Sequence, residues 1–215
     1  MDQPTGAIRV KVCGLTRKAD IQKTIQAGVD AIGLVFYPPS PRHVTLEQAE
    51  SLTADLPPFV SITGLFVNAS RQEIEEACRR CRLDLIQLHG DEPPEACLNL
   101  PRRVIKAVRV GSRADLVGLE GYPVSGLLLD AKVKGVYGGS GTAFDWSLLS
   151  SYRSPAPLIL AGGLNPDNIA DAIHQVRPYA VDVSSGVESA PGMKSPQKVL
   201  RFIQTVKQGP SPQYH

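Results

Sequence analysis

Short hydrophobic runs rich in β-branched residues alternate with amphipathic segments along the whole chain. Runs of this length and composition are typical of buried strands, and strands that alternate with helical segments pair in parallel. The predicted strands are Ile8–Cys13, Ala31–Phe36, Val60–Val67, Leu83–His89, Val104–Val108, Gly126–Asp130, Leu158–Gly162 and Ala180–Ser184.

The segments between these strands carry residues that begin and end helices. Thr45–Gln48 and Ser70–Glu73 match the capping box, in which each end residue accepts a hydrogen bond from the other's backbone amide. Asn165 and Ser195 each precede a proline, which is favoured at the first helical position. Gly28 follows a helical pattern, at the position where a left-handed C-cap is expected.

Eight such units predict an α/β fold, a single (β/α)8 TIM barrel of parallel strands over residues 1–215, with 208–215 as a frayed tail. The chain length lies at the lower end for this fold. The alternative is an open doubly wound sheet. It is disfavoured because CGLTRKAD, after the first strand, lacks the glycine fingerprint of dinucleotide-binding folds.

Charge and hydropathy exclude several classes of partner. The formal net charge is +2 and 20% of residues are charged, so no strong field points to nucleic acid or a membrane surface. The N-terminal MDQPTGAIRV lacks the apolar core of a signal peptide, and no apolar run approaches the ~18 residues of a membrane span. We therefore expect a cytoplasmic protein with neither a nucleic acid nor a membrane as partner.

The four cysteines are expected to be reduced thiols, as in other proteins of a reducing compartment. Cys78 and Cys81 form a C-x-x-C pair, but no second Cys/His pair follows it. The surrounding QEIEEACRRC is typical of a helix, so we interpret the two cysteines as a pair on a helix surface and predict no metal site.

Alternation along the first strand places an ammonium and a thiol on one face. In a barrel, side chains point alternately outward to the helices and inward to the axis. Ile8, Val10 and Val12 then face outward, whereas Lys11 and Cys13 face inward. Cys13 is the last inward residue of its strand, so it belongs at the C-terminal mouth, where barrel enzymes have their active sites.

The same alternation gathers further polar side chains at the strand ends. Gln87 and His89 are predicted to point inward on the fourth strand, Asp130 on the sixth, and Asp182 and Ser184 on the eighth. Such convergence is not typical of a purely structural barrel interior, which is filled by Val, Ile and Leu. A site at this end is therefore expected.

Glycines and serines cluster in the last two predicted loops. Gly162 and Gly163 lie in LAGGLNPDN, and Ser185 and Gly186 lie in DVSSGVES. In barrels these loops grip phosphate with backbone amides and a helix N-terminus, and glycine allows close approach. A third loop, GVYGGSGTAFDW, contains Gly139 and Gly141. It lacks the Lys-Ser/Thr of a P-loop, so we interpret it as a lid over the mouth.

Six segments cover nearly the whole chain in order: KVCGLT, GLVFYPPSPRHVT, QLHGDE, LLLDAKVKGVYGGSGTAFDW, LAGGLNPDN and VDVSSGVESAPGMKS. Together they resemble the phosphoribosylanthranilate isomerase family of tryptophan biosynthesis. The resemblance implies a barrel without cofactor or metal, acting on a small phosphorylated substrate as a monomer or homodimer. The implied reaction is the Amadori rearrangement of N-(5-phosphoribosyl)anthranilate to 1-(2-carboxyphenylamino)-1-deoxyribulose 5-phosphate.

The resemblance also assigns roles to individual residues. It makes Cys13 the general base, Asp130 the general acid and Arg42 the ligand of the anthranilate carboxylate. The further substrate contacts are Gln87, His89, Gly139 and Gly141, and the phosphate contacts are Gly162, Gly163, Ser185 and Gly186.

The general base needs help, because a thiol with a pKa of about 8.5 must be shifted down to act as a thiolate at neutral pH. Lys11 is the candidate for this shift. We hypothesise that Lys11 lies under Cys13 and pairs with Asp182 between the first and eighth strands, since an unpaired buried charge is costly.

Three alternative functions fit these residues less well. The analogous isomerase of histidine biosynthesis uses a carboxylate where this chain has Cys13, and its substrate carries a second phosphate. An epimerase of ribulose phosphate needs metal ligands, and the inward side chains form a poor set for that purpose. A phosphosugar-binding barrel without catalysis would have no need of Cys13 and Asp130.

Overall fold

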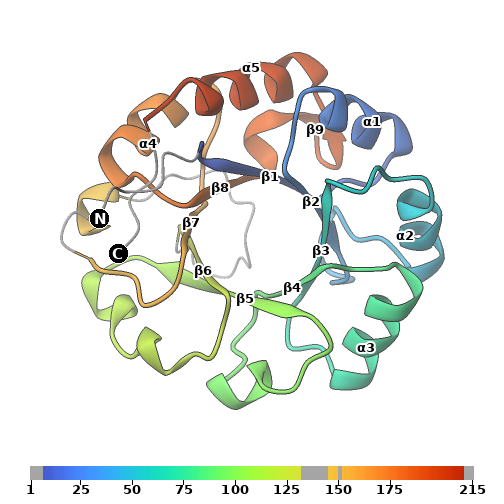
Figure 1. Cartoon of the computed structure of the whole chain (residues 1–215), viewed down its shortest axis with the longest axis horizontal. Helices are drawn as coiled ribbons and strands as arrows, with labels where there is room; N and C mark the ends of the chain where they lie inside the picture. Colours follow the sequence, from blue (N-terminus) through green and yellow to red (C-terminus); the bar gives the residue numbers. More distant parts are fainter. Residues whose placement is uncertain (1–6, 132–144, 150–151, 211–215) are drawn as a thin grey trace.

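Eight parallel strands close into a barrel, and helices surround it (Figure 1). The computed structural model describes residues 7–131, 145–149 and 152–210. The strands are β1 (Arg9–Cys13), β2 (Ala31–Val35), β3 (Ser61–Phe66), β4 (Leu85–Leu88), β5 (Arg103–Val110), β6 (Gly126–Ala131), β7 (Leu158–Leu160) and β8 (Ala180–Val183). Strand β8 pairs with β1 and closes the ring. The predicted fold class is confirmed, while the single domain over residues 1–215 stays a prediction.

The predicted strand bounds differ from the observed ones at their ends. Strand β5 extends beyond the predicted Val104–Val108 at both ends. Strand β7 stops at Leu160 instead of Gly162. Gly162 has a φ of 82°, in the left-handed region, and therefore cannot continue the strand.

Five α-helices pack around the barrel: α1 (Lys18–Gln26), α2 (Leu46–Thr53), α3 (Arg71–Arg80), α4 (Ile169–Val176) and α5 (Pro196–Lys207) in the described part of the chain. Both predicted capping boxes are confirmed, at the starts of α2 and α3. Ser195 caps α5 by accepting a hydrogen bond from the Lys198 amide. Gly28 has a φ of 89°, as expected for the residue after α1. Helix α4 begins at Ile169, later than the predicted start after Asn165.

The units after β4, β5 and β6 contain short 3₁₀ turns within the described residues: η1 (Pro94–Cys97), η2 (Arg113–Leu116), η3 (Leu119–Gly121) and η4 (Trp146–Leu149). After β4, the consecutive prolines Pro93 and Pro94 limit helix formation because proline lacks an amide donor. An antiparallel ribbon after β8 was not predicted from the sequence. There η5 (Ser185–Val187) leads into β9 (Glu188–Ala190), which pairs with β10 (Met193–Lys194).

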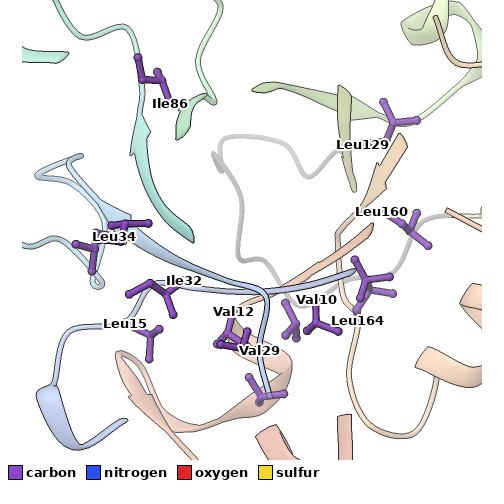
Figure 2. Packing of buried hydrophobic residues seen from close by; sticks show 14 of the residues in the cluster. Val10, Val12, Leu15, Val29, Ile32, Leu34, Ile86, Leu129, Leu160 and Leu164 are labelled. Atoms are coloured by element: carbon purple, nitrogen blue, oxygen red, sulfur yellow. The ribbon is translucent and has the colours of Figure 1, made fainter. Parts of the chain in front are cut away.

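The barrel wall separates two hydrophobic clusters, as the strand alternation predicts. Val10, Val12 and Leu160 belong to the large cluster between barrel and helices, and Figure 2 shows them on the outer side of their strands. A smaller cluster fills the interior and comprises Ile105, Ala107, Leu128, Ile159, Ala161 and Ala180. Cys13 packs with Val35 and Leu65 in a third cluster. The two sides of β1 therefore have the environments that the sequence predicts.

The C-x-x-C pair is not on the surface. Cys78 and Cys81 are 2% and 0% exposed and belong to the core. They continue the buried face of α3 that Ile74 and Ala77 begin, because residues three and four apart share one side of a helix. The predicted surface position was wrong, and all four cysteines of the chain are free thiols.

Candidate active site

A pocket opens at the C-terminal ends of the strands. Its lining residues are Cys13, Val35, Tyr37, Ser40, Arg42, Leu65, His89, Asp130, Ala161, Gly162, Gly163, Leu164, Asp182, Val183, Ser184 and Ser185. This set includes seven of the predicted site residues, from the first, second, fourth, sixth, seventh and eighth strands or the loops that follow them. The structure thus brings together side chains that are far apart in the sequence.

Cys13 and Asp130 reach this pocket from different parts of the wall. Cys13 is the last residue of β1, and Asp130 is the residue before the last of β6. Both are almost fully buried, with exposed fractions of 5% and 4%. A thiol and a carboxyl group therefore face one cavity, as the predicted base and acid require.

Cys13 lies above a buried ion pair. The Nζ atom of Lys11 is 2.9 Å from Oδ1 of Asp182, and the two residues are register partners of β1 and β8. This pairing confirms the hypothesised contact. Although burial acts in the opposite direction, the Asp182 carboxylate raises the pKa of Lys11, so the ammonium stays charged.

The predicted effect on the thiol was wrong in its net direction. Burial raises the pKa of Cys13 above its ordinary value, and the positive charges of Lys11 and Lys194 only oppose that rise. Removal of a thiolate from water outweighs the attraction of nearby ammonium groups here. Lys11 therefore offsets only part of the rise that burial causes in the pKa of Cys13.

Gly33 makes room for the thiol. A Cβ atom at this position of β2 would lie 2.8 Å from Sγ of Cys13 and 3.1 Å from its Cα. Contacts below 3.0 Å require one of the atoms to move. A glycine beside Cys13 therefore allows the present rotamer of the thiol.

His89 connects the acid to a deeper layer. Its Nε2 atom lies 3.3 Å from Oδ2 of Asp130, and its Nδ1 atom lies 2.9 Å from Nε2 of Gln87. With the amide in this orientation Gln87 donates to Nδ1, whereas Nε2 of His89 is close to Asp130 but makes no hydrogen bond within the described residues. Gln87 is fully buried and does not line the pocket. It supports His89 from below.

Arg42 enters the pocket while held by a carboxylate. Its Nε and Nη2 atoms donate to the two carboxylate oxygens of Glu188, at 2.8 and 2.7 Å. Lys194 donates to the same carboxylate at 2.8 Å. Although burial acts against it, hydrogen bonding to Arg42 lowers the pKa of Glu188. Burial lowers the pKa of Lys194 despite this contact.

The loop after β7 has the geometry of an anion grip. Gly162 and Gly163 both adopt positive φ values, 82° and 65°. The Gly163 carbonyl accepts a hydrogen bond of 2.9 Å from the Asn168 side chain and one of 3.3 Å from Asn165. The amide groups of Gly163 and Ser185 donate no hydrogen bond within the described part of the chain. These donors can therefore receive an anion.

Gly186 was predicted to contact the phosphate, but it is not among the residues that line the pocket. A Cβ atom there would lie 1.8 Å from the Leu164 carbonyl oxygen. It lets the loops after β7 and β8 pack against each other. The predicted lid glycines, Gly139 and Gly141, lie outside the described residues.

Sequence reasoning missed Glu188, Lys194 and Asn168 as residues of the site. Lys194 and Glu188 face each other in the β9–β10 ribbon, which no pattern in the sequence predicted. Asn168 lay in the quoted LAGGLNPDN segment, and its spacing from Asn165 was the available signal. Within the ranges that the structure describes, no group of three or more His, Cys, Asp or Glu residues could hold a metal ion.

The chain is similar to known proteins over most of its length. The family described as N-(5′-phosphoribosyl)anthranilate (PRA) isomerase matches residues 10–205. The N-(5′-phosphoribosyl)anthranilate isomerase of Magnetococcus marinus is 54% identical over 201 residues, which cover 94% of this chain and 96% of the relative. The protein of the same name from Geobacter sulfurreducens is 51% identical over 93% of this chain and 98% of its own.

Solved structures of the same family are also similar to this chain. The phosphoribosyl anthranilate isomerase of Thermotoga maritima superposes with a TM-score of 0.86 at 42% identity, over 93% of this chain and 98% of that one. A structure of such an isomerase in complex with reduced 1-(o-carboxyphenylamino)-1-deoxyribulose 5-phosphate gives 0.85 at 41% identity, with the same coverage. On these matches, the chain belongs to the N-(5′-phosphoribosyl)anthranilate isomerase family.

Proposed function

We propose that this chain catalyses the Amadori rearrangement of N-(5-phosphoribosyl)anthranilate to 1-(2-carboxyphenylamino)-1-deoxyribulose 5-phosphate, a step of tryptophan biosynthesis. The observation that carries the proposal is the common pocket of Cys13 and Asp130, which also contains the glycine loop after β7. A base, an acid and an anion grip are the groups that an aldose-to-ketose isomerisation of a phosphosugar requires.

Asp130 acts first in this proposal. Its carboxyl proton goes to the ring oxygen of the ribose, and the bond between that oxygen and C1 breaks. The electron pair of the amine nitrogen forms a double bond to C1, which gives a protonated Schiff base. His89, 3.3 Å from the Asp130 carboxyl group, would hold this group in place during the transfer.

Cys13 acts second. Its thiolate removes the proton from C2, and the released electron pair forms the C1=C2 bond and neutralises the nitrogen. The resulting enolamine becomes the ketone when its hydroxyl proton is lost and C1 gains a proton. The Cys13 thiol gives its proton to C1, and the Asp130 carboxylate takes the hydroxyl proton. Both groups thereby return to the protonation states in which they began.

Other residues bind the two charged ends of the substrate. Arg42 has the planar fork that suits the anthranilate carboxylate, and it lines the pocket near Cys13. The amides of Gly163 and Ser185 suit the phosphate at the opposite end. Gln87 contributes through His89 and not by its own contact with substrate.

The rival functions make weaker use of these residues. An isomerase of histidine biosynthesis would need a second phosphate grip and a carboxylate in place of Cys13. A binding protein without catalysis would gain nothing from a buried thiol beside an ammonium group. In this site burial raises the pKa of Cys13, and the charge of Lys11 acts against that rise.

The test is incubation of the purified chain with freshly generated phosphoribosylanthranilate. Loss of substrate fluorescence, with a product of unchanged mass that carries a C2 ketone in its NMR spectrum, is the expected result. Asp130→Asn should abolish most of this turnover because Asn cannot supply a proton. Turnover of the histidine-pathway aminoaldose instead would replace the proposal with its rival.

We further propose a cytoplasmic location and a homodimer. The four free thiols suit a reducing compartment, and within the described residues no helix has the length and apolarity of a membrane span. One solved structure from Thermotoga maritima is described as showing generated monomers of an isomerase that is itself called dimeric. Analytical ultracentrifugation distinguishes a dimer from a monomer.

A further inference from the structure

The Glu188 carboxylate is shared by two cations beside the pocket. It accepts hydrogen bonds from Arg42 at 2.8 and 2.7 Å and from Lys194 at 2.8 Å. The side chains of Glu188 and Lys194 are 5% and 1% exposed, whereas that of Arg42 is 12% exposed. The carboxylate and Lys194 are therefore closed off from solvent, and Arg42 is the member that reaches the pocket.

Glu188 has little freedom to move. It is the first residue of β9 and is the register partner of Lys194 in β10. Its carbonyl oxygen accepts a hydrogen bond of 2.9 Å from Nζ of Lys198, on α5. The Lys194 ammonium also donates to the carbonyl of Ser184, at 3.1 Å, while its backbone amide donates to Asp20 at 3.0 Å. The ribbon, α5 and α1 thus fix the carboxylate.

Arg42 reaches the pocket across the end of β1. A Cβ atom at Gly14 would lie 2.4 Å from Cδ of Arg42, so the side chain passes directly over the residue that follows Cys13. Gly14 has a φ of 72°, a conformation that glycine adopts without strain. Arg42 and Cys13 line the same pocket.

One edge of the guanidinium is occupied and another is open. The Nε–Nη2 edge of Arg42 binds Glu188, while its Nη1 atom has no hydrogen-bond partner within the described residues. A guanidinium has donors for two carboxylates, one on the Nε–Nη2 edge and one on the Nη1–Nη2 edge. The open edge therefore matches a second carboxylate without release of the first.

We propose that Glu188, backed by Lys194, is a positioning residue that holds Arg42 by one edge and thereby presents the other edge to the substrate carboxylate. The inference rests on the proposed function, in which Arg42 binds the anthranilate carboxylate. A long arginine side chain fixed before binding loses less conformational entropy on binding, which increases affinity. Glu188 should therefore determine the preference for substrates that carry this carboxylate.

The test compares two ligands and the variant Glu188→Gln. The first ligand is reduced 1-(o-carboxyphenylamino)-1-deoxyribulose 5-phosphate, and the second is the same compound without the carboxyl group. We expect Glu188→Gln to weaken binding of the first about tenfold in calorimetry, with the second unchanged. The KM for phosphoribosylanthranilate should rise about tenfold, and kcat should change by less than about threefold.

A double-mutant cycle identifies the partner through which Glu188 acts. In an Arg42→Ala background, Glu188→Gln should cause no further loss of affinity for the carboxylated ligand. The matched control is Asp30→Asn, because Asp30 also binds two cations, Arg9 and Lys207, but lines a pocket at the other end of the barrel. This control should leave the affinity for both ligands unchanged.

Removal of one partner from a buried ion pair can prevent folding. The double variant Glu188→Gln/Lys194→Met removes both charges and leaves Arg42 without its carboxylate partner. It should therefore show the same roughly tenfold loss of affinity, and only for the carboxylated ligand. Equal weakening of both ligands, no weakening, or tighter binding of the carboxylated ligand would overturn the inference. If wild type does not isomerise phosphoribosylanthranilate, the proposed function itself fails.

Discussion

The Nζ atom of Lys11 lies 2.9 Å from Oδ1 of Asp182, across the seam between β1 and β8 that closes the barrel. Both side chains are almost fully buried, at 6% and 9% exposure. A lone ammonium at this depth would carry a large desolvation cost, and the carboxylate offsets it. The pair allows β1 to hold a positive charge one layer below Cys13.

Replacement of this charge should change the pH dependence of the reaction. Burial raises the pKa of the Cys13 thiol above its ordinary value, and Lys11 opposes the rise. In Lys11→Met the opposition is lost, so the pKa of the thiol rises further. The acidic limb of the kcat/KM profile, which reports ionisation of the free thiol, should move to higher pH. Steady-state kinetics across pH measure the shift.

A second buried lysine supplies the control for this profile. Lys106 pairs with Glu92 at 2.6 Å and is 4% exposed, but it does not line the active-site pocket. Lys106→Met should destabilise the protein and leave the acidic limb in place. An unchanged limb in Lys11→Met would mean that this ammonium does not act on the thiol.

Gly33→Ala tests how closely the thiol has to be placed. The added Cβ atom would lie 2.8 Å from Sγ of Cys13, so the thiol must move. A displacement of about 1 Å at a reacting group can reduce the rate by about 10²-fold. We expect a fall of this order in kcat, measured by the loss of substrate fluorescence.

The control for Gly33 is Gly28, whose added Cβ atom would meet nothing within 4 Å. Its φ of 89° means that Gly28→Ala strains the backbone and costs about 1 kcal/mol of stability. Its kcat should remain that of wild type. If Gly33→Ala also retained full kcat, the position of the thiol would matter less than we claim.

Much of the fold could be predicted because it depends on local patterns. Alternation along β1 separates Val12, in the outer cluster, from Cys13, which lines the pocket. Both capping boxes obey rules that involve residues three positions apart. The Lys11–Asp182 pair was also predictable, because an unpaired inward lysine is too costly in a closed barrel.

The unpredicted features depend on packing between distant segments. The Arg42–Glu188 contact joins residues 146 positions apart through a ribbon that has no sequence signature. The net pKa shift of Cys13 depends on its depth of burial, which alternation does not give. The 3₁₀ turn after β4 is too short to show a helical pattern in the sequence, so it could not be predicted there.

Gly186→Ala should impair phosphate binding although Gly186 does not line the pocket. Its added Cβ atom would lie 1.8 Å from the Leu164 carbonyl oxygen, so the loops after β7 and β8 would have to separate. We expect the KM to rise at least about tenfold and inorganic phosphate to become a weaker competitive inhibitor. Gly121→Ala, with nothing within 4 Å, is the control. Unchanged phosphate inhibition would remove these loops from the phosphate site.

Asp30→Asn should affect stability with a defined pH dependence. Although partial burial acts in the opposite direction, hydrogen bonds from Lys207, the Val10 amide and Arg9 lower the pKa of Asp30 below its usual 3.8. A lowered pKa in the folded state stabilises the protein above pH 3.8, and this contribution is lost as the pH falls through the folded-state pKa.

Urea unfolding of Asp30→Asn and wild type at pH 7 and below pH 3.8 measures this contribution. The variant should be less stable at pH 7, and the difference should shrink at the lower pH. A difference of the same size at both pH values would show that the ionised carboxylate is not its source. The kcat should not change, because Asp30 lies far from Cys13 at the other end of the barrel.

The central claim is that Cys13 removes the C2 proton while Asp130 supplies the ring-opening proton from the other side of one pocket. Turnover of phosphoribosylanthranilate by wild type and by Cys13→Ser, followed by fluorescence, tests it most directly. The account predicts a folded Cys13→Ser protein whose kcat is lower by about 10²–10⁴-fold. A folded Cys13→Ser protein that turns over at the wild-type rate would contradict it.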